Sequence, residues 1–560
     1  MSDKAQTERL KILPQWWQLW RNPIFHRYRR SRLRVSSLIT GALLYGGTSL
    51  LFYLMALGVT VTQTELPFEE TAVYPFGLLV FLQIFILNFV GTGEVAAGMA
   101  RESVDEVLTY QRLTPLSPAT KIIGYLVGLP VRQFYHFILT VPVTVIIITT
   151  GQIPTEIWLP IYAVLFTSTL MFYLLAMSVG FIMGKRFSAL ISQGLVALLY
   201  FALPQLSNFG FVIFEYLTIR PALFAAANKM LPKVKMFEHD QYALFYHWEV
   251  SHTIYCIVLQ CLIAWIFYSL MLRRWRRESS HLLSKVQSVA IVSILHIITL
   301  GGVWANTSNG SIFDVQIQTR NPEMALLQQT VSENVELIAA SVLALYGIIG
   351  FSFAILLQYI YTPDKFRYIA GLRERKNQDK TPYAVLSDSA SGIPTSLLIT
   401  LITTVAWLIY SNHLSQSPRI AEFIAGESWL PIDTMLIAVS VTTLLSHGLS
   451  LEYLGKKLNG TIACFTWVTP LAVALLLSAW SFGEKASSFI YGFSPLSMHF
   501  SPGYLIVGLH NSEDPTLFIY GCQVGLFVYF SVGLYCVIRI IQRHKRFMLM
   551  RESNSFLAKN

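Results

Sequence analysis

Two residues, Arg132 and His136, have types and a spacing that could do chemistry. They lie four residues apart in a mostly apolar run, so a helix would present both on one face. Inside a bilayer such a pair could line a pathway for an anionic group. The alternative is that Arg132 extends to the phosphates of the cytoplasmic lipid headgroups, as long basic side chains near the end of a span do. The residues alone leave both interpretations open.

The sequence lacks the motifs of catalysis and nucleotide binding. A phosphate-binding loop requires G-x-x-x-x-G-K-[ST], and Gly91-Thr92-Gly93 is rich in glycine but has no such lysine. No HExxH motif, Ser/His/Asp order or paired-carboxylate site stands out. The five cysteines lie in apolar runs and form neither a disulfide framework nor a metal-ligand pattern. We therefore expect no enzymatic activity, metal or directly bound cofactor, and any ATP would be bound by another polypeptide.

Other ionisable residues of the apolar runs have simple interpretations. Glu452 stands four residues before Lys456, a spacing that predicts a local ion pair at a helix end. His296 and His447 are isolated histidines in apolar surroundings, which favours packing residues over ligands. The sequence shows no chain of buried carboxylates of the kind that proton coupling would use.

The composition predicts an integral membrane protein. Of the 560 residues, 54% are hydrophobic and 13% are charged, whereas soluble proteins carry about 25% charged residues. A chain this long and apolar could not hide its surface in one soluble core. The elements that position any functional residue are therefore expected to be membrane-spanning helices.

Twelve apolar segments are long enough to cross a bilayer. With the N-terminus in the cytoplasm, 33 of the 41 Lys and Arg residues fall on the cytoplasmic side. Both termini are therefore predicted to be cytoplasmic, and the net charge of +10 indicates anionic lipid rather than nucleic acid as its partner. The predicted spans are 35–61, 73–92, 124–150, 157–182, 188–213, 251–272, 287–305, 335–361, 394–412, 430–452, 459–481 and 516–540.

The layout of basic residues and loops repeats once along the chain. Lys185-Arg186 after the fourth span corresponds to Lys456-Lys457 after the tenth. Six spans followed by six in the same orientation indicate a parallel duplication. The predicted fold is an all-α integral membrane protein of about twelve helices in two six-helix repeats. Its parts are a cytoplasmic tail with an interfacial helix (1–34), a first half (35–272), a cytoplasmic linker (273–286), a second half (287–541) and a basic cytoplasmic tail (542–560).

The segment before the first span mixes aromatic and basic residues. Rings at headgroup depth and cations facing phosphates are typical of a helix that lies in the membrane interface. A basic flank that only sets the topology is an equally simple interpretation. The residues that carry this pattern are Trp16, Trp17, Trp20, Arg29 and Arg30.

A charged, amphipathic insert at 94–123 separates the second span from the third. Proline interrupts a helix because it lacks an N–H and restricts the residue before it, so Pro115 and Pro118 predict a break before the chain re-enters the membrane. The expected result is a short cytoplasmic helix at an angle to the spans, although a solvated connector is the alternative. The insert at 362–393 is its counterpart in the second half.

The run R-E-x-x-x-E-x-L followed by T-P-L-S-x-x-x-K resembles the loop after the second span of ABC-2-type permeases, the membrane subunits of one class of ABC exporter. The resemblance covers the first half well and the second half by layout. It implies that a separate ABC ATPase subunit touches Arg101, Glu102, Asp105, Glu106, Thr114, Pro115, Leu116 and Ser117. The second-half counterpart is the weaker pattern Arg373, Glu374, Arg375, Thr381 and Pro382. By the same resemblance, 16–34 would be the connecting helix that transmits the movement of the ATPase.

The resemblance implies a permease subunit of an ATP-driven exporter in the cell inner (plasma) membrane. Both halves would lie on one chain and would work with two copies of the ATPase subunit, with ATP bound there and not on this chain. Two alternatives are an ion- or proton-coupled secondary transporter and a membrane scaffold for lipid or polysaccharide assembly. The first would need a buried carboxylate essential for transport, and the second a cluster of His and Asp at one membrane face.

Overall fold

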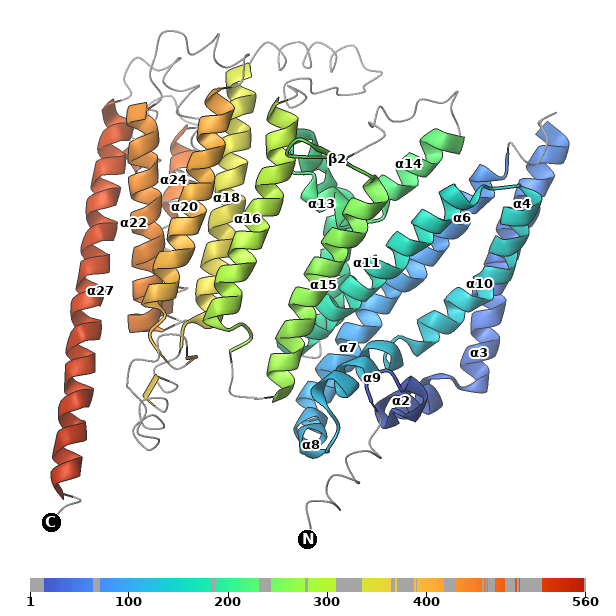
Figure 1. Cartoon of the computed structure of the whole chain (residues 1–560), viewed down its shortest axis with the longest axis horizontal. Helices are drawn as coiled ribbons and strands as arrows, with labels where there is room; N and C mark the ends of the chain where they lie inside the picture. The colour runs from blue at the N-terminus through green and yellow to red at the C-terminus, as the bar shows by residue number, and fades with distance from the viewer. Residues whose placement is uncertain are drawn as a thin grey trace. The chain divides into compact units, whose positions relative to one another are not determined.

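The computed structural model describes residues 15–63, 71–182, 187–230, 243–276, 281–308, 335–363, 390–416, 430–455, 469–478 and 516–557, together with a few single residues and pairs between them. The chain divides into two compact units, residues 1–280 and 281–560. The division falls inside the segment expected to link the two halves. Figure 1 shows that long helices make up both units.

The first unit begins with two short helices, η1 (Leu19–Arg21) and α2 (Pro23–Arg32). Several of its remaining helices follow one another directly and form long apolar rods. A two-stranded hairpin, β1 (Ala243–Phe245) and β2 (Trp248–Val250), is the strand structure described there. The helices that follow are α3 (Val35–Gly41), η2 (Ala42–Gly46), α4 (Gly47–Gln63), α6 (Val73–Ile84), η3 (Phe85–Gly91), α7 (Thr92–Val104), α8 (Val107–Leu113), α9 (Pro118–Gly128), α10 (Val131–Thr150), α11 (Thr155–Ile182), α12 (Ser188–Ala197), η4 (Leu198–Ala202), η5 (Leu203–Phe209), α13 (Ile213–Tyr216), α14 (Arg220–Met230) and α15 (His252–Arg276).

The second unit is described as six helices. They are α16 (Lys285–Ser308), α18 (Val335–Tyr361), α20 (Ile393–Ser415), α22 (Leu430–Leu454), α24 (Thr469–Ser478) and α27 (Thr516–Leu557). The last of these runs past the predicted end of its span and through most of the segment expected to be a separate basic tail. In Figure 1 it extends well beyond the end of its neighbour α22.

Within the described part of the chain, nine helices are long and apolar enough to cross a membrane. Six of them belong to the first unit and three to the second, where α18 adds a shorter apolar stretch. The prediction of a helical, multi-pass membrane protein is thus confirmed. Twelve spans, a duplicated fold and cytoplasmic termini stay predictions.

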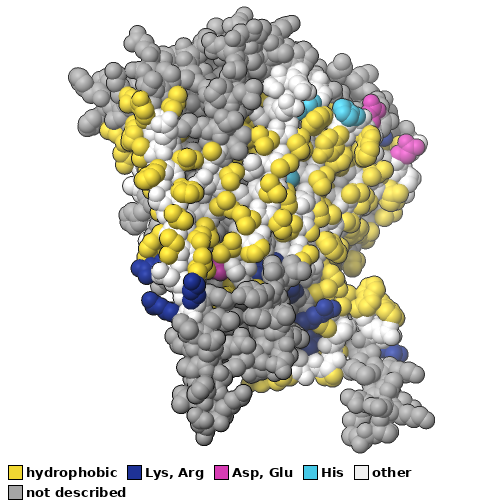
Figure 2. All heavy atoms as spheres, turned by 60° about the vertical axis from the view of Figure 1, so that its left-hand side comes forward, with side chains coloured by type: hydrophobic (Ala, Val, Ile, Leu, Met, Phe, Trp, Pro, Cys, Tyr) yellow, Lys and Arg dark blue, Asp and Glu magenta, His cyan; other side chains and the backbone are white. Residues whose placement is uncertain are grey.

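Exposed apolar side chains along these helices are consistent with contact between the helices and lipid. Val35, Ile39 and Leu43 follow one another at four-residue intervals and are each more than half exposed. Such a continuous apolar face would be unstable in water but suits contact with acyl chains. On the face drawn in Figure 2, hydrophobic side chains cover the helices while Lys and Arg gather toward one end.

Two predicted spans are interrupted where the sequence contains proline. The third, expected at 124–150, is divided by Leu129-Pro130 into α9 and α10. The fifth, expected at 188–213, changes at Leu203-Pro204 into the tighter helix η5. The physical reason is the same in both cases, because proline cannot donate the hydrogen bond that would continue an α-helix. The break at Pro130 separates the short helix α9 from the membrane-spanning α10.

Candidate coupling site

The insert predicted at 94–123 begins as a continuation of the second span, because that helix runs on to Val104. The rest of it contains a short helix between two turns. Helix α7 ends at Val104, and Glu106 takes the left-handed conformation with φ of 56°. Helix α8 then runs for 7 residues to Leu113, and Thr114 leaves it in an extended conformation. Ser117 starts the next helix, since its hydroxyl accepts a hydrogen bond from the Thr120 N–H at 3.1 Å and Pro118 occupies the first helical position. A helix, a break and a restart were expected, and the structure has all three.

Most residues of the expected contact segment lie on its surface. Arg101, Asp105, Glu106, Pro115 and Ser117 are exposed, and Thr114 and Leu116 are half-buried. Three apolar side chains that the sequence analysis did not single out are also exposed. They are Val104 at 54%, Tyr110 at 71% and Leu113 at 81%.

Glu102 differs from its neighbours, because it is buried rather than presented on the surface. Its side chain accepts hydrogen bonds from the hydroxyls of Tyr28 at 2.6 Å and Tyr125 at 3.2 Å, and it forms an ion pair with Arg27. Burial and the bond to this carboxylate raise the pKa of Tyr28, so the phenol remains a donor. Glu102 therefore joins α2, α7 and α9 from inside and does not form part of the exposed contact surface.

A second carboxylate, Glu94, makes a similar connection eight residues before Glu102 on α7. Its two oxygens lie 2.6 Å from Arg32 Nη1 and 2.5 Å from Arg132 Nη2. Arg32 Nη1 also donates to the Leu129 carbonyl at 2.7 Å. The Arg132 side chain is thus held by an internal ion pair and is still 38% exposed, so its extension toward lipid headgroups stays a prediction.

His136 packs against the first membrane helix. Its ring stacks on Tyr45 with centroids 4.3 Å apart. The approach is so close that a Cβ at Gly41 would lie 2.6 Å from His136 Nε2. Arg132 and His136 thus have different partners, and their role as pathway residues stays a prediction.

Helix α2 is also tied to α9 through its N-cap residue, Asn22. Asn22 caps α2, because its side-chain oxygen accepts the Ile24 N–H at 3.0 Å. Its amide nitrogen donates to the Thr120 carbonyl at 2.8 Å. One buried side chain therefore both starts α2 and ties it to the helix that follows the coupling segment.

We expect Asn22→Ala to cost about 1–2 kcal/mol of stability, as removal of a helix cap usually does. Asn22→Asp separates the two roles, because a carboxylate still caps the helix but cannot donate to Thr120. Thermal unfolding in detergent would measure both variants. An Asp variant as stable as the wild type would contradict the assignment of the bond to Thr120.

The remaining residues of the connecting segment point outward. Trp16, Trp17 and Trp20 are 55%, 60% and 69% exposed, and Arg30 is exposed beside the half-buried Arg29. No acidic residue occurs between positions 15 and 41. Exposed aromatic rings and cations in one short segment are consistent with the interfacial position expected from the sequence.

The second-half counterparts Arg373, Glu374, Arg375, Thr381 and Pro382 lie outside the described residues. The described part of that region is held by charged side chains of its own unit. Lys285 Nζ donates to the carbonyls of Ala390 at 2.9 Å and Ser391 at 2.6 Å. Glu452 accepts from Ser391 Oγ and from the Gly392 N–H, both at 2.9 Å. The expected partner of Glu452, Lys456, is outside the described residues, and these bonds give the carboxylate a role at the start of α20 instead.

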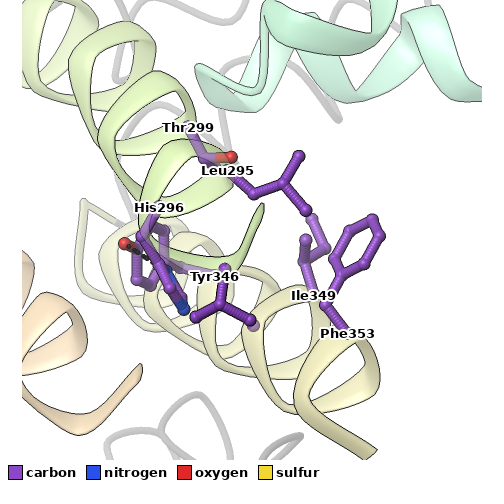
Figure 3. Close-up of a pocket in the computed structure, with 8 residues that line it drawn as sticks. Leu295, His296, Thr299, Tyr346, Ile349 and Phe353 are labelled. Atoms are coloured by element: carbon purple, nitrogen blue, oxygen red, sulfur yellow. Dashed lines mark hydrogen bonds between the residues drawn. The ribbon is translucent and has the colours of Figure 1, made fainter. Parts of the chain in front are cut away.

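His296 is a packing residue, as expected, and it ties three helices together. Its ring nitrogens lie 3.1 Å from the Tyr346 hydroxyl and 3.2 Å from Thr403 Oγ1. Beside it lies a small cavity between α16 and α18, closed by Leu295, Ile349 and Phe353 (Figure 3). Its volume of about 10 Å³ admits no more than one water molecule. It is therefore too small for a transported solute.

The sequence analysis missed Glu94, Arg27, Arg32 and the two tyrosines that surround Glu102. A signal was present, because Glu94 and Glu102 are carboxylates eight residues apart, a spacing that places both on one face of a helix. It could not be used without knowing that α2 folds back onto α7. Neither a protein-family model, a curated protein nor a solved structure matches the chain.

Proposed function

We propose that the chain is the permease subunit of an ATP-driven ABC exporter and that α8 is its contact with a separate ATPase subunit. The observation that carries this proposal is an exposed apolar surface on a short helix outside the apolar spans. Tyr110 and Leu113 of α8 are 71% and 81% exposed, and Val104, the last residue of the helix before it, is 54% exposed. In the predicted topology this helix lies in the cytoplasm, where such side chains favour burial against a partner protein.

The surroundings of α8 resemble the anatomy of a protein interface. Interfaces have an apolar centre and a polar rim, and tyrosine is enriched at the centre. The exposed charged residues Arg101, Asp105 and Glu106 border the apolar side chains of α8. An ATPase subunit would thus bury Tyr110 and Leu113 and would meet the charges at the edge.

The contacts that hold α8 in place support a role in transmitting movement from the ATPase to the membrane helices. Glu102 lies directly before the turn into α8 and is bonded to both α2 and α9. Leu108 of α8 is itself buried. A force applied to α8 would therefore reach α7 and the connecting helix together, instead of being absorbed by a loose loop.

In the proposed mechanism, two copies of the ATPase subunit close on binding ATP and displace α8 and its second-half counterpart. ATP can drive this change only if the closed ATPase dimer binds one state of the permease better than the other. The two six-helix halves would then open toward alternate sides of the plasma membrane. No ATP site is needed on this chain.

We expect the Tyr110→Ser, Leu113→Ser variant to lose most of the ATPase subunit that co-purifies with the wild type in mild detergent. Truncating two central apolar side chains at an interface commonly costs about 2–4 kcal/mol, which is more than tenfold in affinity. Thr109→Ala, on the same helix and also exposed, is the matched control and should retain the partner. ATPase activity of each preparation provides a second readout.

If the wild type purifies without an ATPase and moves solute under an ion gradient, the coupling role of α8 is wrong. The secondary-transporter alternative would then apply. Buried carboxylates such as Glu215, which is 5% exposed, would be the residues to neutralise first.

A further inference from the structure

The elbow between α2 and α3 brings positive charge to one place. Here the elbow means Arg32, Leu33 and Arg34 together with the start of α10. Arg32 and Arg132 share the carboxylate of Glu94, so both guanidinium groups lie within a few ångströms of one acid. Arg34 follows at the N-cap of α3 and is exposed. Three arginines against one glutamate leave two positive charges uncompensated by that acid.

Two contacts connect the segment around Arg34 to the first turns of α10. The Arg32 bond to the Leu129 carbonyl fixes the end of α2 at the start of α10. One turn further along, the Tyr135 hydroxyl donates to the Leu38 carbonyl at 3.1 Å, so α3 and α10 lie side by side there. Arg34 is four residues before Leu38, and Arg132 is three before Tyr135. Both arginines therefore lie at about the same depth, one turn below that contact.

An apolar surface leads away from the elbow along the same two helices. Val35, Ile39 and Leu43 are 72%, 57% and 74% exposed, and Ile138 of α10 is 61% exposed. These side chains mark the side that faces acyl chains. The arginines thus lie at the end of a lipid-facing surface. In a bilayer, this end would be at the depth of the phospholipid headgroups.

We propose that the elbow binds an anionic phospholipid, with its phosphate between Arg34 and the exposed part of Arg132. Its acyl chains would follow the surface formed by Val35, Ile39, Leu43 and Ile138. The argument for this occupant is charge complementarity. Neither the segment 15–41 nor α10 contains an acidic residue, so Glu94 is the carboxylate that opposes these cations there. The side chain of Arg132 is still 38% exposed after pairing with Glu94. The site does not depend on any ATPase partner.

The test is native mass spectrometry of the full chain released from nanodiscs that contain equal amounts of phosphatidylglycerol and phosphatidylcholine. We expect the wild type to retain phosphatidylglycerol selectively and Arg34→Gln to retain about five-fold less, the loss expected for one arginine near the membrane surface. Arg34→Lys should keep most of the binding. Arg276→Gln removes an exposed arginine from the end of α15 and should bind as the wild type does. Because Arg34 is exposed, thermal unfolding of all variants should be unchanged.

Three outcomes would overturn the proposal. Equal retention by Arg34→Gln and the wild type would show that the elbow is not the site. An equal loss in Arg276→Gln would show a general effect of surface charge. Displacement of the bound lipid by millimolar inorganic phosphate would assign the site to a soluble anion instead of a lipid.

Discussion

Glu102→Ala is expected to release α2 from the body of the first unit. The substitution removes the acceptor of the Tyr28 and Tyr125 hydroxyls and the ion-pair partner of Arg27. Breaking a buried pair usually costs about 3–5 kcal/mol. We take about 3 kcal/mol, because the Arg27 side chain is 44% exposed and water can solvate it after the change.

Hydrogen exchange of the α2 amides would measure this effect. A loss of about 3 kcal/mol corresponds to roughly 100-fold faster exchange, if α2 opens as a local unit. Glu102→Gln should have a smaller effect, because the amide oxygen still accepts from one tyrosine while the charge is lost. Glu106→Gln, an exposed carboxylate in the same segment, is the control and should leave exchange unchanged.

The same variants distinguish an effect on the stability of α2 from an effect on the coupling of ATP hydrolysis to transport. If α2 transmits movement from the ATPase, the Glu102→Ala variant should still bind the ATPase subunit through α8. Its rate of ATP-driven transport should nevertheless be lower than that of the wild type. Exchange in α2 that stays as slow as in the wild type would show that Asn22 and Arg32 alone hold the helix. Glu102 would then not be the residue that holds α2 against α7 and α9.

Gly180→Ala is expected to destabilise the first unit by about 3 kcal/mol, the upper end of the cost of overpacking. A Cβ at Gly180 would lie 2.7 Å from both the Ala96 carbonyl oxygen and the Met99 Cβ. Both neighbours are fully buried on α7. Because backbone atoms cannot rotate away, α7 and α11 would have to separate along their contact.

Gly194→Ala is a control for which the expected change in stability has the opposite sign. A Cβ at this position of α12 meets nothing within 4 Å, so the higher helix propensity of alanine should stabilise the protein by up to about 1 kcal/mol. Thermal unfolding in one detergent would compare the two variants. A fall in Tm for both, or for neither, would contradict the close packing of α7 on α11.

The short helix α8 was predictable from local chemistry. Pro115 and Pro118 interrupt the helix wherever the chain lies in space, because the missing N–H and the restriction on the preceding residue are local properties. Pro130 has the same effect in the third span, and reading it in the same way would have separated α9 from α10.

The helical membrane class and the presence of a short helix in the insert after the second span follow from the sequence alone, because span length, apolar composition and proline act within a few neighbouring residues. The burial of Glu102 and the pairing of Glu94 with Arg32 and Arg132 do not. They depend on α2 folding back across α7 and α9, which joins residues as much as 98 positions apart. Sequence spacing predicts faces of single helices, and only the tertiary structure decides which faces meet.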